Sequence, residues 1–158
     1  MTTVAERVVR ALRDEVVHAH QIALDSGDIG KMATRLYKTS ATVGNYYSSR
    51  FNGTFDPTRT RAYVNRMAKS QMKSTALDGL GSASQATNFG TREFAKQNPR
   101  ADWVLTWRHF PSARSREAHS NAAGLEIPFG DDFGVIPPMG APFCGCIAEL
   151  SIARATPR

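Results

Sequence analysis

The sequence predicts an α+β fold, in which a mostly helical N-terminal two-thirds is followed by a small antiparallel-sheet unit with a short helix. Apolar residues recur at helical spacing through the first part of the chain. After Ala101 the pattern changes, because Trp103, Leu105 and Trp107 alternate with residues of the opposite face, as in a strand. The length of 158 residues and the hydrophobic content of 41% suit one domain, or one domain with a helical arm.

The first helix has a clear start signal. Thr3 and Glu6 form a capping-box pattern, in which each side chain satisfies a free backbone amide. The apolar stripe that follows has a spacing of four residues and consists of Val4, Val8, Leu12 and Val16. These signals predict one helix to about Leu24, ended by Gly27 and Gly30.

Two further helices are expected in the middle of the chain. One begins at Ile29 and fades between Gly44 and Gly53. The next begins at Asp56-Pro57, because Asp caps a helix and Pro suits its first position, and it runs to about Leu77.

The C-terminal part begins with a break and ends in short strands. The segment Gly79–Ser82 predicts the break, and the helix after it stops near Asn98. Beyond the tryptophan strand, we expect a short helix over Arg116–Ala122 and short strands over Leu125–Phe129 and Cys144–Ile152.

The positive charge is concentrated in the middle of the chain. The net charge is +6, but Lys31–Lys73 holds nine basic residues and one acidic residue, Asp56, so this segment alone carries +8. Such an excess predicts sequence-independent contact with the phosphates of double-stranded DNA. The residues that we expect to make this contact are Arg59, Arg61, Arg66, Lys69 and Lys73. The alternative is a solvated helix face, or a face that meets an acidic protein partner.

Both cysteines and one histidine form a cluster of soft metal ligands. Cys144 and Cys146 are two positions apart, so on a strand they would face the same side and could bind one zinc ion together with His119. The alternatives for the remaining ligands are His109 in place of His119, and Asp131 or Asp132. The paired Cys-x-x-Cys spacing of structural zinc sites is absent from the sequence. We therefore favour the alternative without a cofactor. In this alternative the cysteines are small buried hydrophobic residues, and His119 forms a hydrogen bond between the short helix and the sheet.

A Cys–His pair is also the arrangement of a nucleophilic enzyme. Catalysis would require a thiol within hydrogen-bond reach of a base, an oxyanion hole and a third, orienting group. The sequence has no local signature for the last two. We expect that the chain is not an enzyme, and the alternative is a small enzymatic or toxin-like module that uses this Cys/His site.

The order of landmarks between Trp103 and Leu150 is more specific than the fold class. The tryptophan strand leads to an Arg-Glu-Ala-His turn, then to Ala-Gly-Leu, an Asp-Asp loop, a Pro-Pro step and Cys-Gly-Cys. This order resembles the C-terminal domain of the phage Mu F-like minor head proteins of tailed bacteriophages. The family usually has Arg between its two cysteines, whereas this chain has Gly145 there. The first 55 residues carry no part of the resemblance.

The resemblance implies a structural virion component of low copy number. Such proteins act in head morphogenesis and in packaging or delivery of the genome, at the portal and the inner face of the capsid. The implied partners are the portal and major capsid proteins, double-stranded DNA and further copies of the chain in a low-copy ring. The implied location is the inside of the head, after synthesis in the cytoplasm of the bacterial host.

The resemblance also suggests a division of the chain. We expect residues 1–55 to be a helical assembly arm and residues 56–153 to be a Mu F-like head-morphogenesis domain that folds alone. Residues 154–158 are expected to be a frayed tail. No stretch of the sequence reaches the roughly 20 apolar residues of a membrane span, so we expect no membrane partner.

Overall fold

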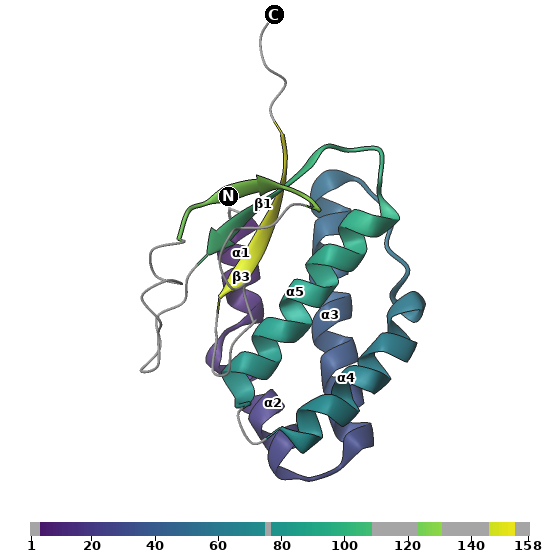
Figure 1. Ribbon diagram of the computed structural model, residues 1–158, viewed down its shortest axis with the longest axis vertical. Coiled ribbons are helices and arrows are strands. Elements are labelled where there is room, and N and C mark those ends of the chain that lie inside the picture. Colours follow the sequence, from purple (N-terminus) through teal and green to yellow (C-terminus); the bar gives the residue numbers. More distant parts are fainter. Residues whose placement is uncertain (1–3, 75–76, 109–122, 131–145, 154–158) are drawn as a thin grey trace, which may run out of the picture.

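The protein is described by a computed structural model that covers residues 4–74, 77–108, 123–130 and 146–153 (Figure 1). The elements within these ranges are the helices α1 (Val4–Ala11), α2 (Asp14–Asp25), α3 (Ile29–Phe51), η1 (Pro57–Thr60), α4 (Arg61–Lys73) and α5 (Gly79–Gln97), and the strands β1 (Trp103–Arg108), β2 (Glu126–Pro128) and β3 (Ile147–Ile152). The predicted α+β class is confirmed. None of the helices in these ranges combines the length and apolar character that crossing a bilayer requires.

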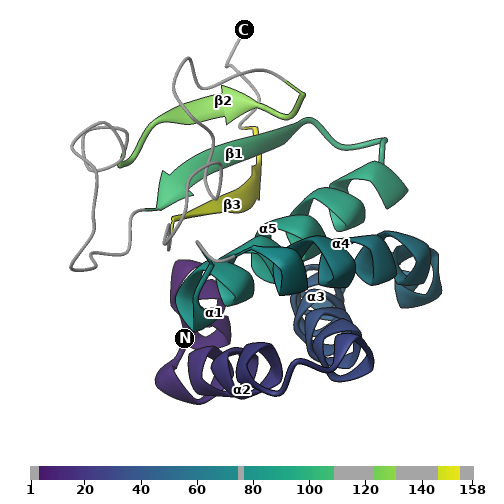
Figure 2. The same cartoon turned by 60° about the horizontal axis from the view of Figure 1, so that its bottom comes forward.

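Helix α5 lies at the centre of the molecule and packs against α2, α3 and β3. Figure 2 shows the sheet on one side of α5, and α2 and α3 on the other. Most buried positions of α5 are Gly, Ala, Ser or Thr, so neighbouring backbones come close to it. A Cβ atom at Gly90 would lie 2.5 Å from the carbonyl oxygen of Ser40, and one at Gly79 would overlap that of Val17. Glycine is therefore required where α5 crosses α3 and α2.

The sheet has the order β2-β1-β3, and both strand pairs are antiparallel. Trp107 pairs with Ala148, and Leu105 pairs with Leu150. The backbone amides of Ala148 and Leu150 do not point at β1: they donate to the Asn88 side chain at 2.8 Å and to the Tyr47 hydroxyl at 3.1 Å. Side chains of α5 and α3 thus bond the outer edge of β3 and fix the sheet against the helices.

A buried polar network connects α2 with α3, α4 and α5. The Ser82 hydroxyl donates to Gln71 at 2.8 Å, so its oxygen accepts from Nδ1 of His20, also at 2.8 Å. Nε2 of His20 then accepts from the Thr39 hydroxyl at 2.9 Å, which corresponds to a neutral ring with its proton on Nδ1. Burial, with a smaller contribution from Arg35, lowers the pKa of His20 from 6.5 to about 3.

The structure corrects the first predicted helix, which is two helices. The chain turns at Leu12 and Arg13, where Arg13 is extended with ψ 157°. Leu12 is buried in the core cluster beneath the sheet, whereas Ala23 is buried in a second cluster with residues of α3, α4 and α5. No Gly or Pro lies at this turn, and the local sequence favours a continuous helix. Tertiary packing therefore determines the turn.

The predicted end of the second helix between Gly44 and Gly53 is confirmed, whereas the predicted break over Gly79–Ser82 lies inside a helix. Helix α3 continues through Gly44, where the ring of Phe55 occupies the space of a Cβ atom, and ends before Asn52 in the left-handed conformation. Helix α5 begins at Gly79, because the Asp78 carboxylate caps it by accepting from the amide of Gly81. The three predicted strands are present, and β3 begins at Ile147. The predicted short helix over 116–122 lies outside the described residues.

The predicted boundary at residue 55 does not coincide with a gap in the packing. Val8, Val43 and Tyr47 belong to one buried cluster with Phe94 and Leu150. A second cluster joins residues of α2 and α3 to residues of α4 and α5. These contacts argue against independent folding of residues 56–153, because the first three helices supply a large part of both clusters.

Candidate nucleic-acid interface

Helix α4 buries one face and presents basic residues on the other. Its buried residues are Val64, Ala68 and Gln71. Arg66, Lys69 and Lys73 are separated by three and four positions, so they lie along one exposed face opposite the buried one. Seven residues at the rise of an α-helix extend about 10 Å, which corresponds to roughly three phosphates of one DNA strand.

The other two predicted contact residues lie at the N-terminal end of this helix. The guanidinium of Arg61 lies 4.3 Å from the centre of the Tyr37 ring on α3. Nε of Arg59 is 3.8 Å from the Asp56 carboxylate, and both side chains are exposed. Hydrogen bonds from Thr58 lower the pKa of Asp56, with a smaller effect of Arg59. Asp56 therefore acts first as the cap of η1 and offsets the charge of Arg59 only weakly.

Aromatic rings contact two arginines of the basic face, Arg61 and Arg66. The Tyr63 ring stacks on Phe89 of α5, with 4.3 Å between ring centres and 5° between planes. The guanidinium of Arg66 lies 5.8 Å from the centre of the Tyr63 ring. Arg61 and Arg66 are thus restrained by rings rather than by carboxylates, which leaves their charge available to an external anion.

No described neighbour neutralises the basic face of α4. The segment Pro57–Leu77 contains no Asp or Glu. Within the described part of the chain, no carboxylate forms an ion pair with Arg61, Arg66, Lys69 or Lys73. The structure therefore brings four of the five predicted residues together on or beside α4 without a charge partner, and Arg59 has one exposed pair.

The predicted metal ligands fall largely outside the described residues, which include neither His119 nor Cys144. The side chain of Cys146 is buried, and its carbonyl oxygen accepts from Ser84 and Asn88 at 2.6 and 3.2 Å. No group of three His, Cys, Asp or Glu residues suited to a metal occurs among the residues that the structure describes. The zinc site stays a prediction, as does the reading without a metal.

Sequence reasoning did not single out a second group of arginines. Arg7 and Arg10 of α1 lie beside a groove that Arg50 of α3 also lines. In the sequence, the first two stand among acidic residues and the third is 40 positions away from Arg10, so no local charge excess marks them. Only the packing of α1 on α3 brings the three together.

A comparison of the chain with family models, with curated proteins and with solved structures found no match to any of them. The resemblance to Mu F-like minor head proteins therefore rests on the residues between Trp103 and Leu150 alone. The fold and the described surface define a small α+β protein with an uncompensated basic helix.

Proposed function

We propose that the chain is a structural minor head protein of a tailed bacteriophage, which acts in head morphogenesis and contacts packaged DNA without sequence preference. The observation that carries the DNA contact is the basic face of α4, where Arg66, Lys69 and Lys73 have no ion-pair partner among the described residues. The motif order between Trp103 and Leu150 supports the assignment to the head. The portal, the major capsid protein and further copies in a low-copy ring are the proposed protein partners.

The physical basis of the contact is the release of counterions from the DNA. Each phosphate that a Lys or Arg neutralises adds about −0.9 to the slope of log K against log salt. Five contact residues therefore predict a slope of about −4 to −5. The sequence contains no spacing typical of a helix-turn-helix, zinc-finger or RNA-recognition module, so duplexes of different sequence should bind alike.

The DNA contact is tested by fluorescence anisotropy with a labelled duplex over a range of salt concentrations. Replacing Arg59, Arg61, Arg66, Lys69 and Lys73 by Gln should abolish binding at moderate salt without unfolding the protein. The matched control replaces five exposed basic residues elsewhere: Arg13, Lys31, Arg92, Lys96 and Arg100. Because both variants lose the same charge, equal loss of affinity in the two would show that net charge, and not the α4 face, determines binding.

The assignment to the head is tested in bacterial cells that produce the phage encoding this chain. An affinity-tagged copy should copurify with DNA-filled heads through a density gradient and should crosslink to the portal. Recovery no greater than that of an unrelated tagged protein of similar size would overturn the assignment, whatever the result with DNA.

A further inference from the structure

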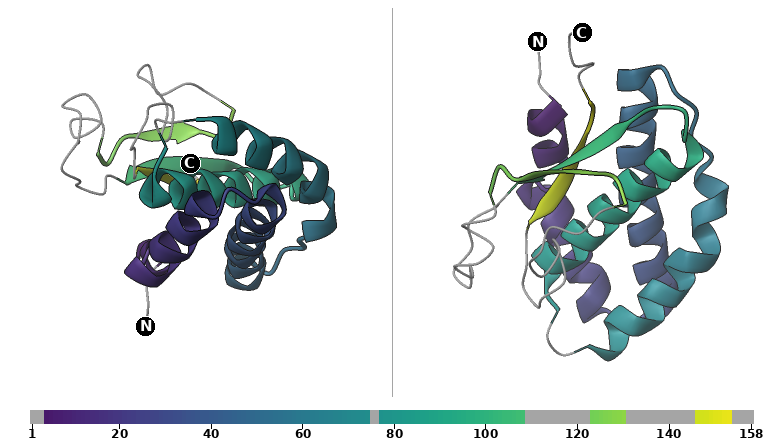
Figure 3. Two further views of the ribbon diagram at one scale, coloured as in Figure 1. Left: turned by 90° about the horizontal axis from the view of Figure 1, so that it is seen from below. Right: turned by 45° about the horizontal axis from the view of Figure 1, so that its top comes forward.

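A groove between α1 and α3 is lined by charged side chains. Its cavity volume is about 1100 Å³. The positive side chains that line it are Arg7, Arg10 and Arg50. Figure 1 shows α1 and α4 on opposite sides of α3, so this groove is distinct from the basic face of α4. Figure 3 shows the same separation from two further directions.

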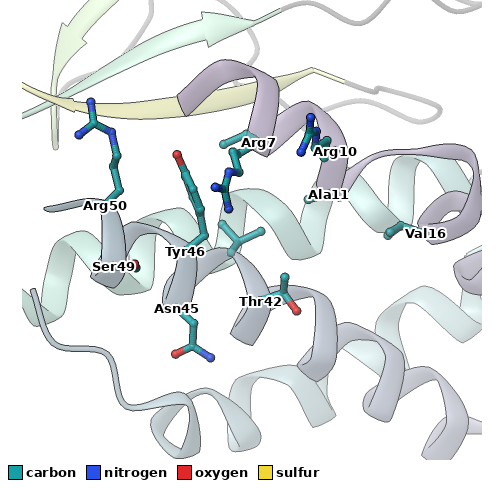
Figure 4. Close-up of a pocket in the computed structure, with 11 residues that line it drawn as sticks. Arg7, Arg10, Ala11, Val16, Thr42, Asn45, Tyr46, Ser49 and Arg50 are labelled. Atoms are coloured by element: carbon teal, nitrogen blue, oxygen red, sulfur yellow. The ribbon is translucent and has the colours of Figure 1, made fainter. Parts of the chain in front are cut away.

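Two of the three arginines, Arg7 and Arg50, lie on either side of Tyr46. The guanidinium of Arg7 lies 5.4 Å from the centre of the Tyr46 ring. Figure 4 shows Tyr46 between Arg50 and Arg7, with Arg10 one turn further along α1. Burial raises the pKa of Tyr46, whereas the nearby charges of Arg50 and Arg7 act in the opposite direction. Both guanidiniums therefore lie close enough to act on the same hydroxyl.

The arginines of the groove have no anion to bind within the described structure. No described carboxylate forms an ion pair with Arg7, Arg10 or Arg50. Glu149 is near enough to affect the pKa of Tyr46, but its Oε2 is already bonded to Nε of Arg108 at 3.0 Å. Three guanidiniums held at one groove repel each other, so an external anion would relieve this repulsion.

The interior of the groove is apolar. Ala11 and Val16 are half-buried and form its accessible apolar surface, and the buried Val8 and Val43 lie beneath them. Thr42, Asn45 and Ser49 of α3 add hydrogen-bonding groups along the rim, at a spacing that places them on one helix face. A ligand that fits must therefore offer an apolar group to the base and anionic groups to the rim.

We propose that this groove binds an acidic segment of a partner protein, in which carboxylates flank a large apolar side chain. Guanidinium groups match carboxylates in paired geometry, and Arg and Tyr are the residue types enriched at protein interfaces. A DNA backbone offers phosphates but no aliphatic group for Ala11 and Val16, so the peptide fits the whole groove better. This surface is independent of the α4 face and of the proposed contact with DNA.

The test uses the full chain and labelled synthetic peptides in which Asp or Glu pairs flank a single Leu or Phe. Each acidic peptide has a counterpart with Asn and Gln in place of the acids. Anisotropy at low salt should show the acidic peptide binding at least about tenfold more tightly than its counterpart. If no acidic peptide of the set binds more tightly than its counterpart, the proposal is overturned.

The site is tested with two variants of equal charge. Replacing Arg7, Arg10 and Arg50 by Gln should remove the preference for acidic peptides and leave affinity for duplex DNA unchanged. The control replaces the exposed Arg13, Arg92 and Arg100 by Gln and should retain peptide binding. Equal peptide affinity in the two variants, or a loss of DNA affinity confined to the first, would overturn the proposal.

Chemical shift mapping provides a check that requires no variant. Backbone amide shifts on addition of the acidic peptide should be concentrated in residues 7–16 and 42–50. Shifts concentrated in residues 61–73 would instead place the peptide on the basic face of α4 and exclude the groove. Because the α4 contact with DNA is measured separately, failure of the groove proposal leaves that measurement unaffected.

Discussion

Acidification from about pH 7 to about pH 4 should destabilise the protein through His20. The ring is fully buried between α2, α3 and α5, and both of its nitrogens bond to hydroxyls rather than to a carboxylate. Burial keeps its pKa near 3, whereas an unfolded chain would have the ordinary value of 6.5. Between these values the unfolded state binds a proton that the folded state does not, so stability falls as the pH is lowered.

The size of this effect follows from the difference between the two pKa values. Each pH unit in this window costs about 1.4 kcal/mol, so the loss at about pH 4 is on the order of 3 kcal/mol. That is a large fraction of the roughly 5–15 kcal/mol by which a domain is stable. Above about pH 7 His20 contributes no pH dependence, because both states are neutral there.

Urea unfolding measured at several pH values tests this reasoning. The buried Trp103 and Trp107 provide a fluorescence signal for the transition. His20→Gln is the matched variant, because its side chain keeps a donor and an acceptor but does not titrate. We compare the change of free energy with pH in each protein, so a lower starting stability of the variant does not affect the result. Parallel loss of stability in both proteins would refute the reasoning, and so would an NMR titration in which folded His20 becomes protonated near pH 6.

Three further predictions concern packing, the cysteines and the N-terminal helices. Gly90→Ala should lower the free energy of unfolding by about 1–3 kcal/mol, because its methyl group would press on the Ser40 carbonyl oxygen; an unchanged urea midpoint would show that α3 and α5 separate easily. Replacing Cys144 and Cys146 together by Ala should lower the free energy of unfolding by about 1–2 kcal/mol if both are packing residues. Stoichiometric zinc in elemental analysis, together with a sharp loss of stability on chelation, would instead establish the metal site. Removing residues 1–55 should leave residues 56–153 unfolded, as measured by circular dichroism. The buried side chains that are lost each contribute about 1.5–3 kcal/mol to stability. A cooperative thermal transition of the fragment would instead show that residues 1–55 are a separate arm.

Local signals in the sequence predicted the features that depend on neighbouring residues. The alternation around Trp103 gave strand β1, and Asp56-Pro57 gave a helix start in which the Asp56 carboxylate accepts from the amide of Thr58. The basic residues of α4 were identified from composition. Because they lie close together in the sequence, their excess positive charge remains in one place when the segment folds into a helix.

Features that depend on contacts between distant residues could not be predicted in this way. The sequence does not show that Gly44 is a packing site, because the ring of Phe55 reaches it only in the folded chain. His20 was not singled out, because its bonding partners Thr39 and Ser82 are 19 and 62 positions away. The arginine groove likewise required knowledge of which helices meet.

The bonds from Asn88 and Tyr47 to β3 bear on how the protein avoids aggregation. A free strand edge presents unpaired amides to which a strand from another molecule can add, and such addition can continue without limit. Here the amides of Ala148 and Leu150 are already bonded to side chains of the same molecule. An incoming strand would have to break both bonds before pairing with β3. These two bonds therefore disfavour assembly by extension of the sheet past β3.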